Sequence, residues 1–359
     1  MLKLSDEFIS KEFESKIVAK AKKARKQLSD IFKKIKEIDY EFYNLPTTIK
    51  PRKIAALDGG GFSEDFVGIT VTPARAAGAI FEQNKDPIWI EETDVEILTI
   101  DDDPKNFGAL FRDLLEVKVA QKLIEKKPEV IFLDGSITNF AYKGIPQSIR
   151  YSLQDGQEIE DDSIGFKFYD LFLKYIKASY ELLTKCIVDD ILILGVSKDS
   201  RANILVNHLF EKSKKKPLIT DTTLVNIIAN GRTGFTKPIE FSPKIRDIRT
   251  KIWKAAEVFQ EKELQSFNLS YVVLKERALP IRIDSLIPQQ KRLKEIFEAM
   301  VTYHDGNGFI TPAYLTHNRA NMKQDLGNRI INYITEEIFD ESPELYQAFF
   351  SQRRRDVIQ

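Results

Sequence analysis

The chain has 359 residues, with 54 lysines and arginines against 54 aspartates and glutamates, three histidines and one cysteine. One cysteine excludes a disulfide framework, and so few histidines and cysteines leave carboxylates as the main candidates to bind a metal, which favours Mg²⁺ or Mn²⁺ over zinc or copper. A net charge of zero excludes a global attraction to nucleic acid, so contacts with DNA would have to come from local patches.

The first residues of the chain do not have the pattern of a signal peptide. The first residues, MLKLSDEFISKEF, are charged throughout and lack the apolar stretch of a signal peptide. No apolar run approaches the roughly 20 residues that cross a bilayer. We therefore expect a cytoplasmic protein that does not enter the membrane.

Residues 1–45 have the periodicity of a helix. Lysines and arginines fill most positions between the apolar residues, so the helix is either an ordinary solvated one or a basic arm that dimerises the protein or contacts phosphates. Prolines at 46 and 51 end the segment, and we assign residues 1–50 to an N-terminal helical arm. The apolar positions alternate in spacings of four and three, as in a coiled coil or helical hairpin: Ile17, Ala21, Ala24, Leu28, Ile31, Ile35 and Ile38.

Residues 54–100 have the pattern of an antiparallel meander. The apolar run 54–57 ends in Asp58-Gly59-Gly60-Gly61, and three further strand candidates follow at 67–72, 78–81 and 95–100. The triple glycine and Thr72-Pro73 are typical of turns.

The rest of the chain alternates between helix and strand. We expect helices at 107–126, about 144–153 and 166–186, and another that follows residues 197–201 and ends at about residue 210. From residue 288 onward we expect mainly helix. Buried strands are expected at 130–133 and 191–196, with later strands at 269–275 and 281–283. We assign residues 51–340 to one domain and residues 341–359 to a C-terminal helical tail.

Three carboxylates stand out by their positions. Asp58 and Asp134 each follow an apolar strand and precede a glycine, at the strand ends where α/β sheets bind ligands; two unrelated Asp-Gly turns are the alternative. Glu116 lies on an apolar stripe of the predicted helix, where burial is costly unless the group binds a metal or pairs with Arg112 one turn earlier.

The order of these elements predicts an α/β fold with a ribonuclease H-like mixed sheet flanked by helices. In that arrangement a meander, a helix and a parallel strand bring three carboxylates to one end of the sheet. Such a cluster holds two divalent ions roughly 4 Å apart, which activate water and stabilise the leaving oxygen in attack on phosphorus. The N-terminal arm and the helical C-terminal region complete the predicted fold.

In six short motifs, which follow family order over about residues 50–325, the chain resembles the NurA family of nucleases. The motifs are Ile54–Gly60, the helix with Arg112 and Glu116, Ile131–Ser136, Leu194–Ser200, Thr220–Thr222 and Gly308–His317. The resemblance implies a Mn²⁺-dependent (or Mg²⁺-dependent) DNA nuclease with 5′→3′ exonuclease and single-strand endonuclease activity. It further implies a homodimer that works with HerA, a hexameric DNA-translocating ATPase, in end resection, repair or defence.

The resemblance also implies roles for single residues. Asp58, Glu116 and Asp134 would be metal ligands, and Lys198 would contact the scissile phosphate unless it is an ordinary loop lysine. His317 would complete the metal site or move protons; a purely structural histidine is the alternative.

Two positions in the motifs leave questions open. Asp221 lies in the family motif Thr220–Thr222; the alternative is that it only caps a helix that starts at residue 222 or 223. The family often has tyrosine where this chain has Phe309. Either that hydroxyl is dispensable, or Tyr303 or Tyr314 supplies it, or activity is reduced.

Two other functions compete with the nuclease. An actin-like or sugar-kinase-like ATPase would use LDGGGFSEDFVGITV and Asp134-Gly135 as phosphate loops, but it lacks a convincing adenosine segment and has no role for Glu116. The second alternative is a non-catalytic adaptor that loads a DNA translocase. The presence of all three carboxylates, Asp58, Glu116 and Asp134, argues against it. The chain contains no G-x-x-x-x-G-K-[ST] loop, so the energy for translocation would come from a partner.

Overall fold

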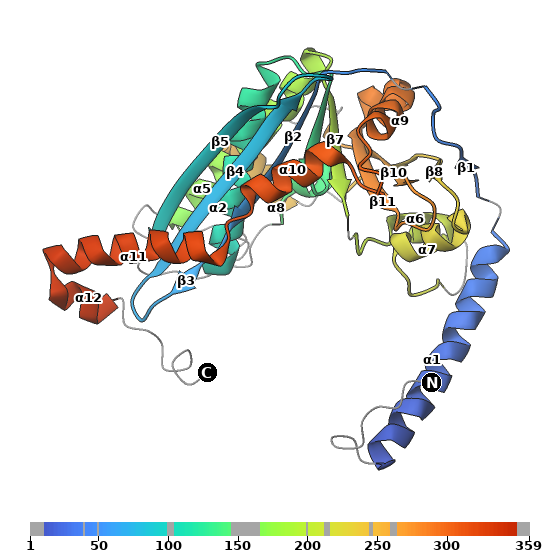
Figure 1. Ribbon diagram of the computed structural model, residues 1–359, viewed down its shortest axis with the longest axis horizontal. Helices are drawn as coiled ribbons and strands as arrows, with labels where there is room; N and C mark the ends of the chain where they lie inside the picture. Colours follow the sequence, from blue (N-terminus) through green and yellow to red (C-terminus); the bar gives the residue numbers. More distant parts are fainter. Residues whose placement is uncertain are drawn as a thin grey trace.

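A computed structural model of the chain describes residues 11–38, 40–48, 50–98, 104–144, 166–198, 200–211, 216–243, 247–258 and 264–349. Its strands form one mixed sheet in the order β1-β8-β10-β11-β7-β6-β2-β4-β3, with β5 paired to β4 and β9 to β10. Helices cover both faces of this sheet (Figure 1).

The first half of the sheet has the predicted ribonuclease H-like order. Strands β2 (Ile54–Gly61), β4 (Thr70–Phe81) and β5 (Ile88–Leu98) form the antiparallel meander, and helix α2 (Pro104–Ile124) follows it. Strand β6 (Val130–Asp134) then pairs parallel to β2, and β7 (Leu192–Ser197) pairs parallel to β6.

The remaining elements extend the sheet and surround it. The strands are β1 (Phe42–Tyr43), β3 (Glu64–Asp65), β8 (Gly234–Thr236), β9 (Ile239–Phe241), β10 (Phe267–Val273) and β11 (Ile281–Leu286). The helices are α1 (Lys11–Lys36), α3 (Ile137–Ala141), α5 (Phe166–Val188), α6 (Ile204–Leu209), α7 (Asp221–Ala229), α8 (Asp247–Ala255), α9 (Leu293–Thr302), α10 (Thr311–Ala320), α11 (Gln324–Glu341) and α12 (Pro343–Phe349), with a 3₁₀ turn at Ile287–Arg292. The predicted helical C-terminal region is confirmed, whereas residues 145–153 of another predicted helix lie outside the described residues.

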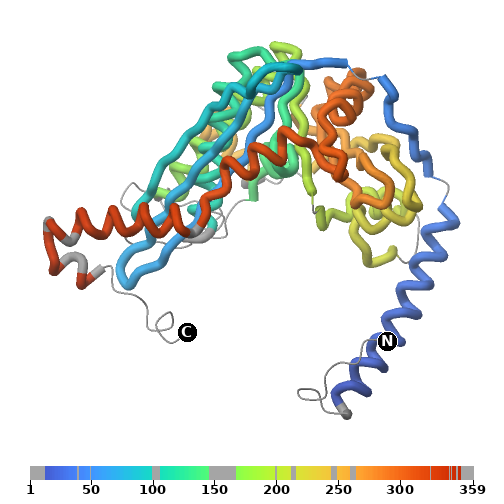
Figure 2. Tube along the Cα trace, viewed as in Figure 1, coloured from blue at the N-terminus to red at the C-terminus, as the bar shows by residue number. Residues whose placement is uncertain are grey.

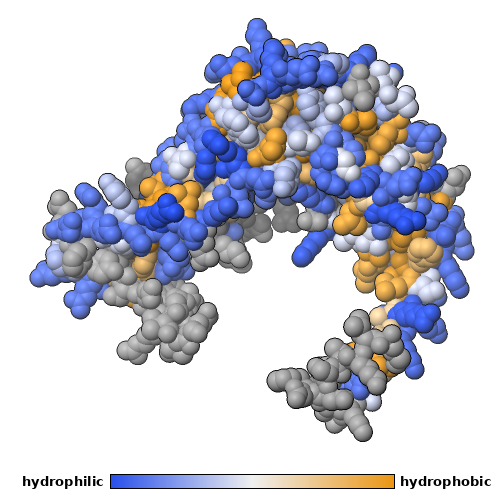
Figure 3. Space-filling model, in the orientation of Figure 1, coloured by the Kyte–Doolittle hydropathy of each residue, from blue (hydrophilic) through white to orange (hydrophobic). Residues whose placement is uncertain are grey.

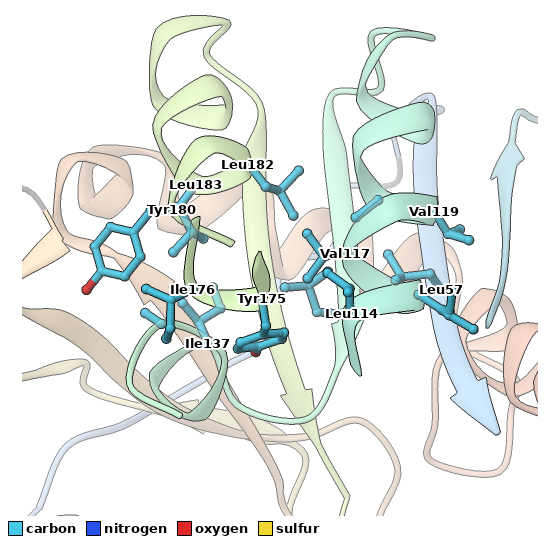
Figure 4. Close-up of a cluster of buried hydrophobic side chains, with 14 of the residues drawn as sticks. Leu57, Leu114, Val117, Val119, Ile137, Tyr175, Ile176, Tyr180, Leu182 and Leu183 are labelled. Carbon is cyan, nitrogen blue, oxygen red and sulfur yellow. The ribbon is translucent and has the colours of Figure 1, made fainter. Parts of the chain in front are cut away.

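Alternating side chains of the central strands are buried on both faces of the sheet. Ala55 and Leu57 of β2 pack with α2 and α5, where Leu114 and Tyr175 fill the space between helices and sheet (Figure 4). Ile54 and Ala56 point the other way, into a second cluster with α9 and α10. Because both faces are covered, the strands read as continuous apolar runs, which is why they were visible in the sequence.

The two predicted turns near the first strand are wrong. Gly59–Gly61 continue β2, and Pro73 lies inside β4. The glycines are needed for packing: a Cβ at Gly60 would lie within 3.0 Å of the Ala320 carbonyl oxygen in α10. Proline has no N–H to donate to a neighbouring strand. Pro73 lies between the β2–β4 ladder, which ends at Ala74, and the β3–β4 ladder, which ends at Val71, so neither ladder loses a hydrogen bond there. Its carbonyl accepts the N–H of Phe62, just beyond the end of β2.

Among the described residues, the N-terminal helix α1 packs against the body through its C-terminal end. Ile35 is 1% exposed and packs with Ile31 and Ile38 against α6 and α7, whereas Ile17 and Leu28 are 41% and 62% exposed. The helix therefore projects from the body, while α11 lies at the other end of the molecule against β4 and carries α12 (Figure 2). Among the described helices, none has the length and apolar character needed to cross a membrane.

Candidate metal centre and its cavity

The ends of two parallel strands bring Asp58 and Asp134 together. Leu57 and Leu133 form the last residue pair of the β2–β6 ladder, so each aspartate comes next in its strand. Asp134 ends β6 as predicted, but Asp58 lies inside β2 rather than at its end, because β2 continues along β4 after its parallel neighbour has stopped. Strand alternation places both carboxylates on the sheet face that α10 covers.

Helix α10 adds His317 to this pair. One ligand atom from each of Asp58, Asp134 and His317 lies within 4.8 Å of the other two. His317 Nδ1 is 2.6 Å from Asp58 Oδ2, and Asp58 is only 5% exposed. The approach of α10 depends on Gly60, since only a residue without a side chain leaves room for Ala320. The predicted aspartates and histidine thus form one cluster.

Glu116 reaches the same cavity from the opposite face of the sheet. It comes from α2 and passes beside Gly59, where a Cβ would overlap its side chain. Burial, followed by the nearby charge of Asp113, raises the pKa of Glu116 well above its ordinary value. The alternative ion pair with Arg112 is also present, with Nε 3.5 Å from Oε1. Glu116 therefore lies beside the cluster of Asp58, Asp134 and His317, and its carboxylate is paired with Arg112.

The cluster has the electrostatic character of a cation site. Burial, and then the charge of Asp58, raises the pKa of Asp134 to about 6. Carboxylates that are buried close together repel one another when they are ionised, which raises their pKa values. A bound divalent ion supplies the positive charge that offsets this repulsion. Oxygen ligands with one imidazole nitrogen suit Mn²⁺ or Mg²⁺. The residues present therefore fit a divalent metal, which Asp58, Asp134 and His317 could hold with Glu116 beside them.

Lys198 is held between a carboxylate and an aromatic ring. Its Nζ lies 3.8 Å from Asp134 Oδ2 and 4.8 Å from the centroid of the Phe309 ring. The predicted site lysine thus lies in the cavity, and Phe309 supports it through a cation–π contact, a role that sequence reasoning missed. Neither Tyr303 nor Tyr314 is among the described residues that line the cavity; the hydroxyl of Tyr303 donates to the Arg52 carbonyl instead.

Asp221 has a structural position away from the cavity. It is fully buried, and its carboxylate accepts the N–H groups of Leu205 and Val206 at the start of α6 and the hydroxyl of Tyr271. Thr220 caps α7. The prediction that Asp221 caps a helix starting at residue 222 or 223 is therefore wrong: α7 begins at Asp221 itself, and the Asp221 carboxylate binds the N–H groups at the start of α6.

The cavity has a volume of about 810 Å³, and several residues that line it were not predicted. Ser136 and Arg282 are the most informative, because they form a hydrogen-bonded group with the buried Asp284. Gly195 makes room for the turn that carries Ser136, since a Cβ there would overlap the backbone of residues 135–137. A signal was present: Arg282 and Asp284 are two charged residues on the same face of an otherwise apolar strand.

Comparisons with known proteins agree with this arrangement. No curated protein matches the chain. Among solved structures, the NurA nuclease from Sulfolobus solfataricus matches with a TM-score of 0.66 at 19% identity, covering 93% of this chain and 98% of that one. NurA with manganese matches with a TM-score of 0.62 at 12% identity, covering 90% and 98%. NurA bound to dAMP and manganese matches with a TM-score of 0.50 at 12% identity, covering 88% and 94%.

These structures share the fold of this chain at low identity. The family model described as the NurA domain matches residues 52–321, which is well over half of the chain and includes all five predicted site residues. The chain therefore belongs to the NurA family.

Proposed function

We propose that the protein is a metal-dependent deoxyribonuclease. The observation that carries the proposal is the cluster of Asp58, Asp134 and His317 at the strand ends, with Glu116 and Lys198 in the same cavity. Membership of the NurA family supports it, as do the related structures described as a nuclease and as bound to manganese. The proposed substrate is DNA and the proposed reaction is hydrolysis of its phosphodiester bonds.

We assign Asp58, Glu116, Asp134 and His317 as ligands for Mn²⁺ or Mg²⁺, with room for two ions. A bound divalent ion would supply Lewis-acid stabilisation of the charge that develops at phosphorus and on the leaving oxygen. The protein supplies positioning: the carboxylates of Asp58 and Asp134 lie on paired strands and that of Glu116 on a packed helix, so little reorganisation is needed when substrate binds.

His317 and Lys198 have separate roles in the proposed reaction. When Nδ1 of His317 donates to Asp58, Nε2 is left as the basic nitrogen, which could bind a metal ion or accept a proton. Lys198 points its ammonium toward the cluster and would donate to an oxygen of the scissile phosphate. The Phe309 ring holds the lysine without needing a hydroxyl, which supports the interpretation that the tyrosine hydroxyl is dispensable here.

The proposal makes metal dependence the first measurement. We expect end-labelled DNA to be cleaved with Mn²⁺ or Mg²⁺ and to stay intact in EDTA, because carboxylates alone cannot stabilise the anionic transition state. Saturating Mn²⁺ should also raise the melting temperature by several degrees, since a ligand at 100 times its dissociation constant stabilises by about 2.7 kcal/mol. Cleavage in EDTA would refute the proposal, and a melting temperature that ignores Mn²⁺ would contradict the metal site.

The two rival functions predict different results in that assay. An ATPase of the actin-like or sugar-kinase-like type would hydrolyse ATP and leave DNA intact, and neither the family match nor the position of Glu116 supports it. A non-catalytic adaptor would bind the metal weakly or not at all and would not cleave under any condition. Nuclease activity that appears only with an ATPase partner would retain the site assignment.

We further propose the finer activities that the resemblance implies: 5′→3′ exonuclease and single-strand endonuclease action in end resection, repair or defence, in the cytoplasm, with a HerA-type hexameric ATPase. We also propose a homodimer, and a division into an arm at 1–50, a nuclease domain at 51–340 and a tail at 341–359. The exposed apolar side chains of α1 support a contact between protein chains: Phe13, Ile17, Val18, Leu28 and Phe32. Figure 3 shows apolar surface in its lower right part, where α1 joins the body.

Removal of the arm tests the dimer proposal. We expect the chain without residues 1–45 to be a monomer by light scattering, with about half the mass of the full-length dimer, because much of the apolar stripe of α1 is exposed within the described residues. Loss of Ile35 and Ile38 from the body makes circular dichroism a necessary control. An unchanged mass for the folded, truncated chain would contradict the role of the arm.

A further inference from the structure

The cavity contains a second group of polar residues beyond the candidate metal ligands. Neighbouring strands carry them in order across the sheet: Asp58 on β2, Asp134 on β6, Lys198 after β7 and Arg282 on β11. Strands lie roughly 5 Å apart, so the backbone of β11 is about 10 Å from that of β6. Of these four residues, the two cations thus lie on the β7–β11 side of the two aspartates.

Arg282 is fixed in place with part of its hydrogen-bonding capacity unused. Its Nε is 2.7 Å from Asp284 Oδ1, and its Nη2 is 3.0 Å from Asp284 Oδ2 and 3.2 Å from Ser136 Oγ. Asp284 is fully buried, and the Arg282 side chain is 8% exposed. Its Nη1 donates no hydrogen bond within the part of the chain that the structure describes, although the side chain lines the cavity.

Arg201 adds an exposed positive charge to the same cavity. It follows β7 by four residues, and no ion-pair partner for it occurs among the residues placed in the structure. By contrast, Arg112 and Lys143 are both paired with Asp113, Lys198 with Asp134 and Arg282 with Asp284. Among the described lysines and arginines that line the cavity, Arg201 is therefore the one without an ion-pair partner, and it lies on the β7 side.

We propose that Arg282, together with Arg201, binds the phosphate of the nucleotide adjacent to the cleaved phosphodiester. The substrate named here rests on the proposed function. A guanidinium held rigidly by Asp284 and Ser136 presents Nη1 at little entropic cost, and phosphate oxygens are its best-matched ligand. A strand that lies across the sheet edge would place one phosphate at the carboxylates and the next over β11.

Binding of short DNA in EDTA tests this without cleavage. The probe is hexathymidylate with a 3′ fluorophore, measured by anisotropy over a series of salt concentrations. The variants are Arg201→Ala and the double variant Arg282→Met with Asp284→Asn, which removes both charges and leaves no unpaired buried carboxylate. The control Lys85→Ala removes one cation from the exposed β4–β5 turn.

We expect each site variant to bind about tenfold more weakly and the control to stay within about twofold. The slope of log affinity against log salt should shrink by about 0.7 for each lost phosphate contact. If the double variant fails to fold by circular dichroism, Arg201→Ala and Arg282→Lys, which keeps the charge but loses the fork, carry the test.

Neutral methylphosphonates locate the contact. Scanning one methylphosphonate along the hexamer should weaken binding by wild type at the contacted phosphate and leave the Arg282 variant unaffected there. If adding a 5′-phosphate to the hexamer restores the affinity that a methylphosphonate removed, the contacted group is a terminal phosphate and not an internal one.

Wild-type affinity and salt slope in both site variants, or no measurable binding by wild type, would overturn the subsite. Its failure is distinct from failure of the nuclease, because binding in EDTA requires no catalysis. Loss of affinity in a protein that never cleaves would support the subsite alone, and cleavage with unaltered binding would reject the subsite alone.

Discussion

Asp134→Ala is expected to abolish DNA cleavage, with a loss of about 10³-fold or more, while the protein stays folded. The substitution removes one of the ligands around the candidate metal, and several kcal/mol of transition-state stabilisation depend on that ion. Asp58→Ala should have the same effect, and it also removes the carboxylate that orients His317. The measurement is the rate of cleavage with saturating Mn²⁺.

The stability of the Asp134 variant distinguishes a functional carboxylate from a structural one. Burial and the charge of Asp58 raise the pKa of Asp134 to about 6, so its ionised form is disfavoured in the folded protein. The resulting cost is fully present above about pH 6 and disappears as the pH falls toward 4, where the group is protonated in both folded and unfolded states. In EDTA at pH 7, Asp134→Ala should therefore melt no lower than wild type.

Manganese should reverse that order. Wild type is expected to gain several degrees of melting temperature with Mn²⁺, and the variant to gain little. Asp86→Ala in the exposed β4–β5 turn is the matched control and should behave as wild type in both measurements. Normal cleavage rates in both Asp58→Ala and Asp134→Ala would remove the basis of the site assignment.

The sequence was sufficient to predict the order of the central strands and the convergence of the carboxylates. Strands buried on both faces appear in the sequence as apolar runs. Residues that come directly after two neighbouring parallel strands lie close together in space. Asp58, Asp134 and the helix with Glu116 could therefore be placed at one site before any coordinates. His317 and Lys198 depended on the family resemblance, since neither residue has a local pattern that marks it as part of a site.

Contacts between elements distant in the sequence could not be predicted in this way. Gly59 and Gly60 resemble a turn, yet they continue β2 by pairing with β4. They are glycines because Glu116 and Ala320, far along the chain, need the space of a missing side chain. The support of Lys198 by Phe309 and the group formed by Arg282 with Ser136 have the same origin: each joins side chains more than 100 residues apart. Local propensity carries no information on such pairs.

Gly60→Ala is expected to slow cleavage by about 10²-fold, although the residue makes no contact with substrate. Its added Cβ would lie within 3.0 Å of the Ala320 carbonyl oxygen, and backbone on both sides must separate to relieve the overlap. Ala320 ends the helix that carries His317, so the shift moves that ring away from Asp58. A displacement of about 1 Å at a catalytic site costs on the order of 10²-fold, and overpacking costs about 1–3 kcal/mol of stability.

Gly144→Ala is the matched control, because a Cβ at Gly144 would meet no described residue within 4 Å. The double variant Gly60→Ala with His317→Ala identifies the route of the effect: if the glycine acts through His317, the second substitution should add little to the first. Wild-type cleavage by Gly60→Ala would show that α10 can move without consequence, and full additivity would show that Gly60 acts through another part of the site. Near-complete non-additivity would mean that Gly60, two residues after Asp58, is needed to let α10 bring its histidine to the aspartates.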